Sequence, residues 1–274
     1  MGLLAEIAIV AAVLVVSARY GTRPALVGAV TVGGVLVFVS LELLLVFGAS
    51  SLCGILLDDG RRAQASFGHM MTTALLPAGL VVVALAAFPP FNAEEIAQEF
   101  ISGVAGSERW LQGLYPEGNA PGALQDTLVF LLRLAPGAGF LSMLLAAFAA
   151  YVLCQRWFLR HRVELPAIPP FSCWKIWDHL VWLLALGIGL VLLGNARAAA
   201  VGWNLILVMG ALYLLQGLAV LRFRLSRSRI PRPAAIVFYA ALVLTLSVSL
   251  FVVVGLGILD IWIPLRRDRT DALT

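Results

Sequence analysis

Charged side chains inside long apolar stretches are the residues of this sequence best placed to do chemistry. Glu42 interrupts the apolar run from 25 to 57, and Arg133 lies seven residues into the run from 126 to 155. An ionisable group within a bilayer is costly and commonly marks a functional site. Arg133 also shortly precedes Pro136, and a charge beside a broken membrane helix can form a binding site.

Each of these two charges has an alternative interpretation. If the first run bends near Glu42, that carboxylate sits at the outer surface of the membrane. If the second run enters the membrane only after Arg133, the guanidinium reaches the lipid headgroups. Both residues remain candidates for binding a ligand.

Uncharged polar residues recur at helical spacing in the C-terminal half. Met209, Tyr213 and Gln216 fall on one helical face, and Asn204 lies one to two turns earlier on another. Such residues either bind a ligand or tie neighbouring membrane helices together. We therefore add Tyr213 and Gln216 to the ligand-binding candidates.

Motifs for catalysis and metal binding are absent from the sequence. It contains no Walker A loop, no glycine-rich dinucleotide loop, no HExxH and no nucleophile elbow. Asp178 and His179 are adjacent, and adjacent helical residues point about 100° apart, which makes a poor chelate. The three cysteines form no CxxC pair. We expect a non-enzymatic protein without a metal or cofactor.

The elements that must position these residues are membrane helices. Of the 274 residues, 61% are hydrophobic and 12% are charged, against about 45–50% and about 25% in soluble domains. The net charge of +4 comes from short arginine clusters between apolar runs, which membrane orientation produces, and does not indicate nucleic-acid binding. The sequence predicts an all-α, polytopic bundle in a lipid bilayer, forming one domain over residues 1–274.

Long apolar runs with few charges predict the spans, about eight in total. The expected spans are 3–18, 25–39, 41–57, 67–88, 126–155, 174–194, 198–221 and 234–262. The 25–57 run would be about 50 Å long as one helix, against a hydrocarbon core of about 30 Å. Two short helices with a bend near Ser40–Glu42 fit better than one tilted helix. The first run carries Glu6 where a signal peptide has basic residues, so we expect a retained helix.

The polar segment from 89 to 125 contains one short amphipathic helix. Asn92 can cap it, Glu94 and Glu95 suit its first turn, and Ile96 and Phe100 begin an apolar stripe. We expect this helix over 93–104, lying flat on the membrane or on the bundle.

Basic residues set the orientation. With the 89–125 segment outside, the inner loops hold Arg19, Arg23, Arg61, Arg62, Arg156, Arg160, Arg162, Lys175, Arg222, Arg224, Arg227, Arg229 and Arg232. This bias predicts a multi-pass protein of a bacterial inner membrane. The tail arginines 266, 267 and 269 conflict with it: either the tail is outside despite its charge, or one span is miscounted.

A partner protein would dock on the inner segment from 156 to 177. Arginine and aromatic residues are enriched in interface hot spots, and Arg160, Trp174 and Trp177 are the candidate partner-binding residues. Positive-inside charge with an aromatic belt explains the same residues without a partner. Ser142, Ala146 and Ala150 form a small-residue stripe, which suits internal packing or a partner helix.

Three stretches of the C-terminal half carry a resemblance to a known family. They are 170–182 (PFSCWKIWDHLVW), 204–223 with its LQGLAV motif, and 255–262 (GLGILDIW) followed by Arg266-Arg267. They resemble the YybS-like family of bacterial membrane proteins, which has been grouped with the S components of energy-coupling-factor transporters. The resemblance implies a substrate-binding subunit for a small molecule.

Two functional classes follow. The first is a transport-related subunit that binds a small molecule from the outer side and, having no ATPase signature, works with an energising partner. The alternative is a scaffold or assembly subunit of a larger membrane complex. A polar cavity favours the first, and a dry bundle with an exposed small-residue stripe favours the second.

Overall fold

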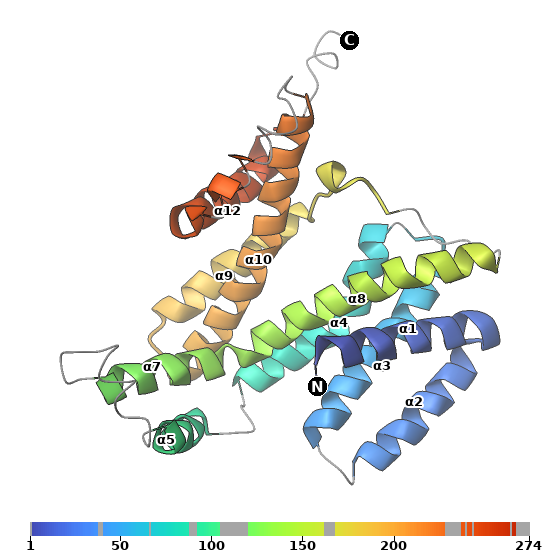
Figure 1. Ribbon diagram of the computed structural model, residues 1–274, viewed down its shortest axis with the longest axis horizontal. Coiled ribbons are helices and arrows are strands. Elements are labelled where there is room, and N and C mark those ends of the chain that lie inside the picture. Colours follow the sequence, from blue (N-terminus) through green and yellow to red (C-terminus); the bar gives the residue numbers. More distant parts are fainter. Residues whose placement is uncertain are drawn as a thin grey trace.

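The computed structural model describes residues 2–37, 41–65, 67–87, 92–104, 120–161, 168–227, 237–238, 240–242, 244–263 and 265–266. Within these residues the regular structure is entirely helical (Figure 1). The all-helical prediction is confirmed for this part of the chain.

The described elements are α1 (Leu3–Tyr20), α2 (Thr22–Leu36), α3 (Leu41–Arg62), α4 (Phe67–Ala87), α5 (Ala93–Val104), α7 (Ala120–Arg133), α8 (Ala135–Arg160), the short 3-10 helices η2 (Phe171–Cys173) and η3 (Asp178–Leu180), α9 (Val181–Leu192), α10 (Ala196–Arg227) and α12 (Leu246–Trp262). Four of these, α1, α4, α8 and α10, are long and apolar enough to cross a membrane. Shorter apolar helices accompany them at 22–36, 178–192 and 248–262.

The helices form two packed groups. In the first, α1, α3, α4 and α8 enclose a core that includes Leu14, Leu57, Met70 and Tyr151. In the second, α10 packs against α9 and α12 around Tyr213. Contacts of α10 with α4 and α8 join the groups, α2 covers α1 and α3 from outside, and α5 lies against α7 (Figure 1).

The 25–57 run is two helices in the structure, α2 and α3, as the length argument favours. The expected 126–155 span is divided at Leu134 into α7 and α8. Pro136 explains this division, because it lacks a backbone N–H and its ring clashes with the preceding turn. It occupies the first turn of α8, where both defects are tolerated.

Two other expected spans are shortened. Residues 174–177 are not helical, so the 174–194 span becomes η3 and the 12-residue α9. The 234–262 span breaks at Thr245, and α12 begins after it. At this break the hydroxyls of Thr245 and Ser249 donate to the carbonyls of Ala241 and Leu242, at 2.8 and 2.6 Å.

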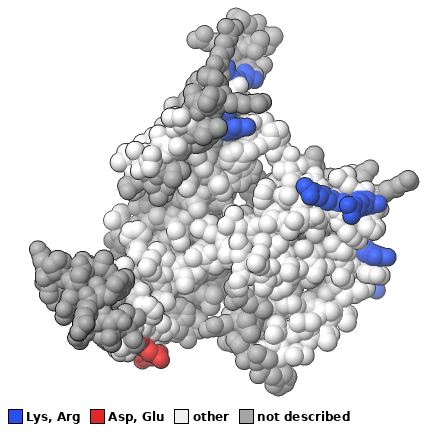
Figure 2. Space-filling model, viewed as in Figure 1, with Lys and Arg blue, Asp and Glu red and all other residues white. Residues whose placement is uncertain are grey.

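Apart from α7, whose last turn contains Arg133 at the junction with α8, the described helices that carry arginines in their last turn end on one side of the molecule. These are α1, α3, α8 and α10, and Figure 2 shows the basic residues along that upper and right edge, with acidic residues at the opposite corner over α5. Cations at helix C-termini interact favourably with the helix dipole. The charge asymmetry of the sequence is therefore an asymmetry of the folded bundle.

A buried carboxylate ties α1 to α3 at this basic end. Asp58 is fully buried, accepts a hydrogen bond of 2.7 Å from the hydroxyl of Ser17, and pairs with Arg61 and Arg62 at 2.8 Å each. Arg62 also donates to the carbonyl of Ser17 at 2.7 Å. We call this group the Asp58 cluster; it comprises Ser17, Asp58, Arg61 and Arg62. Each charged side chain in it pairs with an opposite charge or a hydrogen-bonding group.

Replacing Asp58 should destabilise the first helix group. Asp58→Ala leaves two arginines and a buried hydroxyl without their acceptor, and breaking a buried ion pair costs about 3 kcal/mol. Asp59→Ala is the matched control, because Asp59 is the next residue in the chain and its side chain is exposed. This substitution should change the free energy of unfolding by less than about 0.5 kcal/mol. Unfolding in detergent measures both variants. Equal stability of the two would show that the Asp58 cluster contributes nothing.

The end of the described chain returns to the basic side. Arg266 donates to the carbonyls of Ser172 and Trp174 at 3.0 and 2.7 Å, and it pairs with Asp260 at 2.9 Å. The end of α12 therefore lies beside residues 172–174. The side of the membrane on which the tail lies stays a prediction, and residues 267 and 269 lie outside the described part.

Cysteine labelling tests this orientation. In a Cys173→Ser background, Glu95→Cys should react with a membrane-impermeant maleimide in intact cells. Arg227→Cys and Ile263→Cys should react only after the membrane is opened, because the positive side faces the cytoplasm. Labelling of Ile263→Cys in intact cells would mean that the last segment crosses the bilayer.

Candidate functional site

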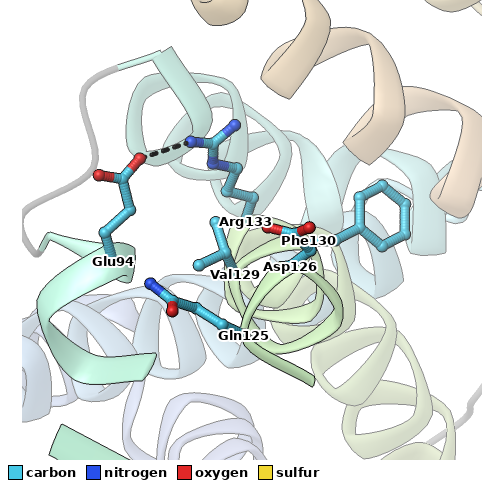
Figure 3. A pocket seen from close by; sticks show the side chains of 6 residues that line it. All are labelled: Glu94, Gln125, Asp126, Val129, Phe130 and Arg133. Carbon is cyan, nitrogen blue, oxygen red and sulfur yellow. Dashed lines mark hydrogen bonds and ion pairs between the residues drawn. The ribbon is translucent and has the colours of Figure 1, made fainter. Parts of the chain in front are cut away.

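A cavity of about 300 Å³ lies where the amphipathic helix α5 meets α7 (Figure 3). It is lined by Glu94, Gln125, Asp126, Val129, Phe130 and Arg133. Five of these come from one face of α7, because positions 125 and 126, 129 and 130, and 133 recur every three to four residues. The sixth, Glu94, comes from the first turn of α5.

Local sequence fixes the wall formed by α5. The side-chain oxygen of Asn92 accepts a hydrogen bond of 3.2 Å from the Glu94 amide, which is a helix cap as expected. Ala97 is buried, whereas Ile96 and Phe100 are 40% and 56% exposed. The face of α5 that contains Ala97 is thus packed inward, and the large apolar side chains of Ile96 and Phe100 are left exposed.

Charges of both signs line the cavity. Arg133 and Glu94 form an ion pair at 3.5 Å, with side chains 49% and 64% exposed, and Asp126 adds a second, exposed carboxylate. In Figure 3 the Gln125 amide points toward α5, below this ion pair. An exposed pair at this distance contributes little to stability, so its partners are free to exchange for a ligand.

A second cavity, of about 110 Å³, adjoins the first. It is lined by Phe130, Arg133, Leu134, Ala196, Ala199, Ala200 and Trp203. Phe130 and Trp203 meet edge to face with ring centroids 5.5 Å apart. Both cavities are lined by Phe130 and Arg133, so they are neighbours. We refer to the two together as the two-lobed pocket, in which the first cavity is the polar lobe and the second is the apolar lobe.

Asn204 of α10 holds the helix break beneath this pocket. Its side-chain oxygen accepts from the amide of Gly137 at 2.6 Å, and its amide group donates to the carbonyls of Arg133 and Ala200 at 2.8 Å each. In an unbroken helix the Gly137 amide would bond directly to the Arg133 carbonyl. The Asn204 carboxamide lies between these two backbone groups and bridges them. Asn204 is only 1% exposed.

The other predicted ligand-binding residues lie elsewhere. Gln216 accepts from the amide of Ile176 at 3.2 Å and donates to Asp260 at 3.1 Å, far along α10 from the pocket. Tyr213 is buried one turn before it, against α12. Glu42 is the second residue of α3, and its side chain lies outside the described part. Among these candidates, the described structure places Arg133 alone at the pocket.

The predicted partner residues lie on the basic side. Arg160 is exposed in the last turn of α8. Trp177 is 49% exposed, with its ring 6.1 Å from that of His69, and Trp174 stacks with Phe171 at 6.4 Å. The stripe of Ser142, Ala146 and Ala150 is packed internally instead, because both alanines are fully buried and the serine hydroxyl donates to Glu6 at 3.0 Å.

Three features of the site escape inspection of the sequence. In the sequence, Glu94 is explained as a first-turn residue of an amphipathic helix. Asp126 stands at the start of an expected span, and Trp203 is one apolar residue among many within another. The spacing from Asp126 to Arg133, two helical turns on one face, is the signal that could have joined them. No group of His, Cys, Asp or Glu able to hold a metal ion occurs among the described residues.

The chain matches, over residues 1–261, the model of a family described as "Predicted membrane protein (DUF2232)". It therefore belongs to this family of membrane proteins. Comparisons with curated proteins and with solved structures give no match.

Asn204 should be essential to the junction of α7 and α8. Asn204→Leu keeps the size of the side chain and leaves the Gly137 amide and Arg133 carbonyl unpaired, at about 1–3 kcal/mol for each buried group. Asn195→Ala is the control. It removes only the exposed cap of α10, whose side-chain oxygen accepts from the Arg197 amide, and this loss costs about 1 kcal/mol. A smaller loss of thermal stability for Asn204→Leu than for Asn195→Ala would refute the role of the carboxamide.

Proposed function

We propose that this protein is a non-enzymatic, transport-related membrane subunit that binds a small molecule from the outer side of a bacterial inner membrane. The single observation that carries the proposal is the two-lobed pocket beneath α5, with Arg133 and Glu94 at its centre. Helices α5 and α7, which line the pocket, lie at the end of the bundle away from the C-terminal ends of α8 and α10 (Figure 1), and the positive-inside rule assigns that end to the exterior.

The chemistry of the pocket suits binding. Ligand sites combine an apolar wall with a few polar groups that fix orientation, and here Phe130 and Trp203 provide the wall while Arg133 provides a charge. The pocket also lies beside a broken helix, where membrane transporters commonly hold their substrates. A carboxylate or phosphate on the ligand would replace Glu94 as the partner of Arg133.

The proposed architecture has about eight membrane segments. α7 and α8 together supply one, η3 and α9 another, and the last, which contains α12, begins and ends on the inner side. Since the sequence holds no ATPase signature, transport would depend on an energising partner. The resemblance of the C-terminal stretches to the YybS-like family, which has been grouped with S components, would imply the same division of labour.

A scaffold or assembly role is the second candidate. It is favoured by exposed aromatic and basic residues that the positive-inside rule assigns to the inner side. Trp177 and Phe171 are 49% and 46% exposed, and Arg160 is exposed at the end of α8. These residues would dock the partner in either role. The buried stripe of Ser142, Ala146 and Ala150 offers no surface to such a partner.

Mass spectrometry of small molecules released from the purified protein tests the proposal. Wild type and Glu99→Gln should release the same compound, because Glu99 lies on α5 but does not line the pocket. Arg133→Ala should retain it at least about tenfold less, since a charge-assisted hydrogen bond contributes about 1.5–3 kcal/mol. If no compound distinguishes Arg133→Ala from the other two folded proteins, the binding function is wrong.

A further inference from the structure

The pocket brings a positive charge, two negative charges and an apolar lobe within reach of one small molecule. The polar lobe contains Arg133, Glu94 and Asp126, and Arg133 and Phe130 also line the apolar lobe. This combination restricts the class of ligand, and the restriction rests on the binding function proposed above.

A ligand of one charge sign fits the polar lobe poorly. A simple anion bound to Arg133 would also face the carboxylates of Glu94 and Asp126, and like charges repel. A simple cation bound to those carboxylates would face the guanidinium. A zwitterion satisfies both, because its anionic group can take Arg133 while its ammonium takes the two carboxylates.

The existing ion pair is suited to such an exchange. The separation of 3.5 Å between Arg133 and Glu94 exceeds the roughly 2.7–2.9 Å of a close charge-assisted hydrogen bond. Both side chains are about half exposed or more, so separating them removes little stabilisation. A zwitterion inserted between them would leave each charge with an opposite partner.

The apolar lobe sets the rest of the ligand. Ala196, Ala199 and Ala200 lie on one face of α10, and with Leu134 and Trp203 they leave about 110 Å³. That is the space of roughly four water molecules at about 30 Å³ each, which suits one compact aliphatic or aromatic group. Small side chains on α10 are what keeps this lobe open.

We propose that the two-lobed pocket binds a small zwitterion of the amino-acid class, with adjacent carboxylate and ammonium groups and an apolar side chain. The carboxylate pairs with Arg133. The ammonium lies between Glu94 and Asp126. The side chain enters the lobe between Phe130, Trp203 and the alanines of α10.

Matched ligands test separately whether the pocket requires the carboxylate, the ammonium group and the apolar side chain. Thermal unfolding of the purified full chain, in detergent, is measured with L-leucine, with 4-methylpentanoate, which lacks the ammonium, with 3-methylbutylamine, which lacks the carboxylate, and with glycine, which lacks the side chain. Leucine should raise the melting temperature, and each of the other three should need at least about tenfold more ligand for the same shift. Equal shifts with leucine and either single-charge analogue would overturn the zwitterion assignment.

Variants of the lining residues test whether leucine binds in this pocket. Arg133→Ala and Asp126→Asn should reduce the leucine affinity at least about tenfold, and Ala200→Leu should abolish the preference for leucine over glycine by filling the apolar lobe. Glu99→Gln should bind leucine as wild type does. Unchanged affinity in folded Arg133→Ala protein would place leucine elsewhere and overturn the assignment.

The same measurements distinguish this inference from the binding function itself. If the carboxylate analogue alone binds and Arg133→Ala removes it, the pocket is a ligand site but not a zwitterion site. A phosphoethanolamine lipid headgroup carries the same pair of charges, so binding is repeated in nanodiscs of phosphatidylcholine and of phosphatidylethanolamine. Leucine binding that survives in both supports a free ligand, and its loss in phosphatidylethanolamine identifies a lipid occupant and overturns the amino-acid assignment.

Discussion

The hydrogen bonds of the Asn204 carboxamide are the interactions on which the pocket end of this bundle depends. A helix that breaks inside a bilayer must satisfy its freed backbone groups within the protein, because no water is present to do so. Asn204 accepts from the Gly137 amide and donates to the Arg133 carbonyl. It therefore fixes α7 relative to α8 and both relative to α10, and side chains of α7 and α10 line the pocket.

Elements determined by local sequence could be predicted, and those determined by distant partners could not. Helix α5 has the expected bounds, 93 to 104, because its cap and its acidic first turn are local signals. The late start of α9 depends on Gln216. Its side-chain oxygen accepts a hydrogen bond from the Ile176 amide, 40 residues earlier in the chain. The path of the last segment depends on Arg266, whose partners at Ser172 and Trp174 lie more than 90 residues earlier.

The candidate site was partly predictable for the same reason. A charge inside an apolar run singles out Arg133 whatever its neighbours are. The helical spacing of uncharged polar residues selects Gln216 as well, yet the structure pairs Gln216 with Asp260, where it ties helices together. Sequence shows that a polar group is buried, and only the tertiary partners show whether a cavity adjoins it. Glu94 and Trp203 belong to the site because α5 and α10 bring them to α7.

Hydrogen–deuterium exchange at the Gly137 amide tests this account most directly. Exchange is followed for the wild-type chain in lipid nanodiscs, with fragmentation that resolves this single position after Pro136. The account predicts slow exchange, because the amide donates to the buried Asn204 side chain, and fast exchange in Asn204→Leu. Fast exchange in the wild type, at the rate of an exposed amide, would contradict the carboxamide clamp and the pocket geometry that rests on it.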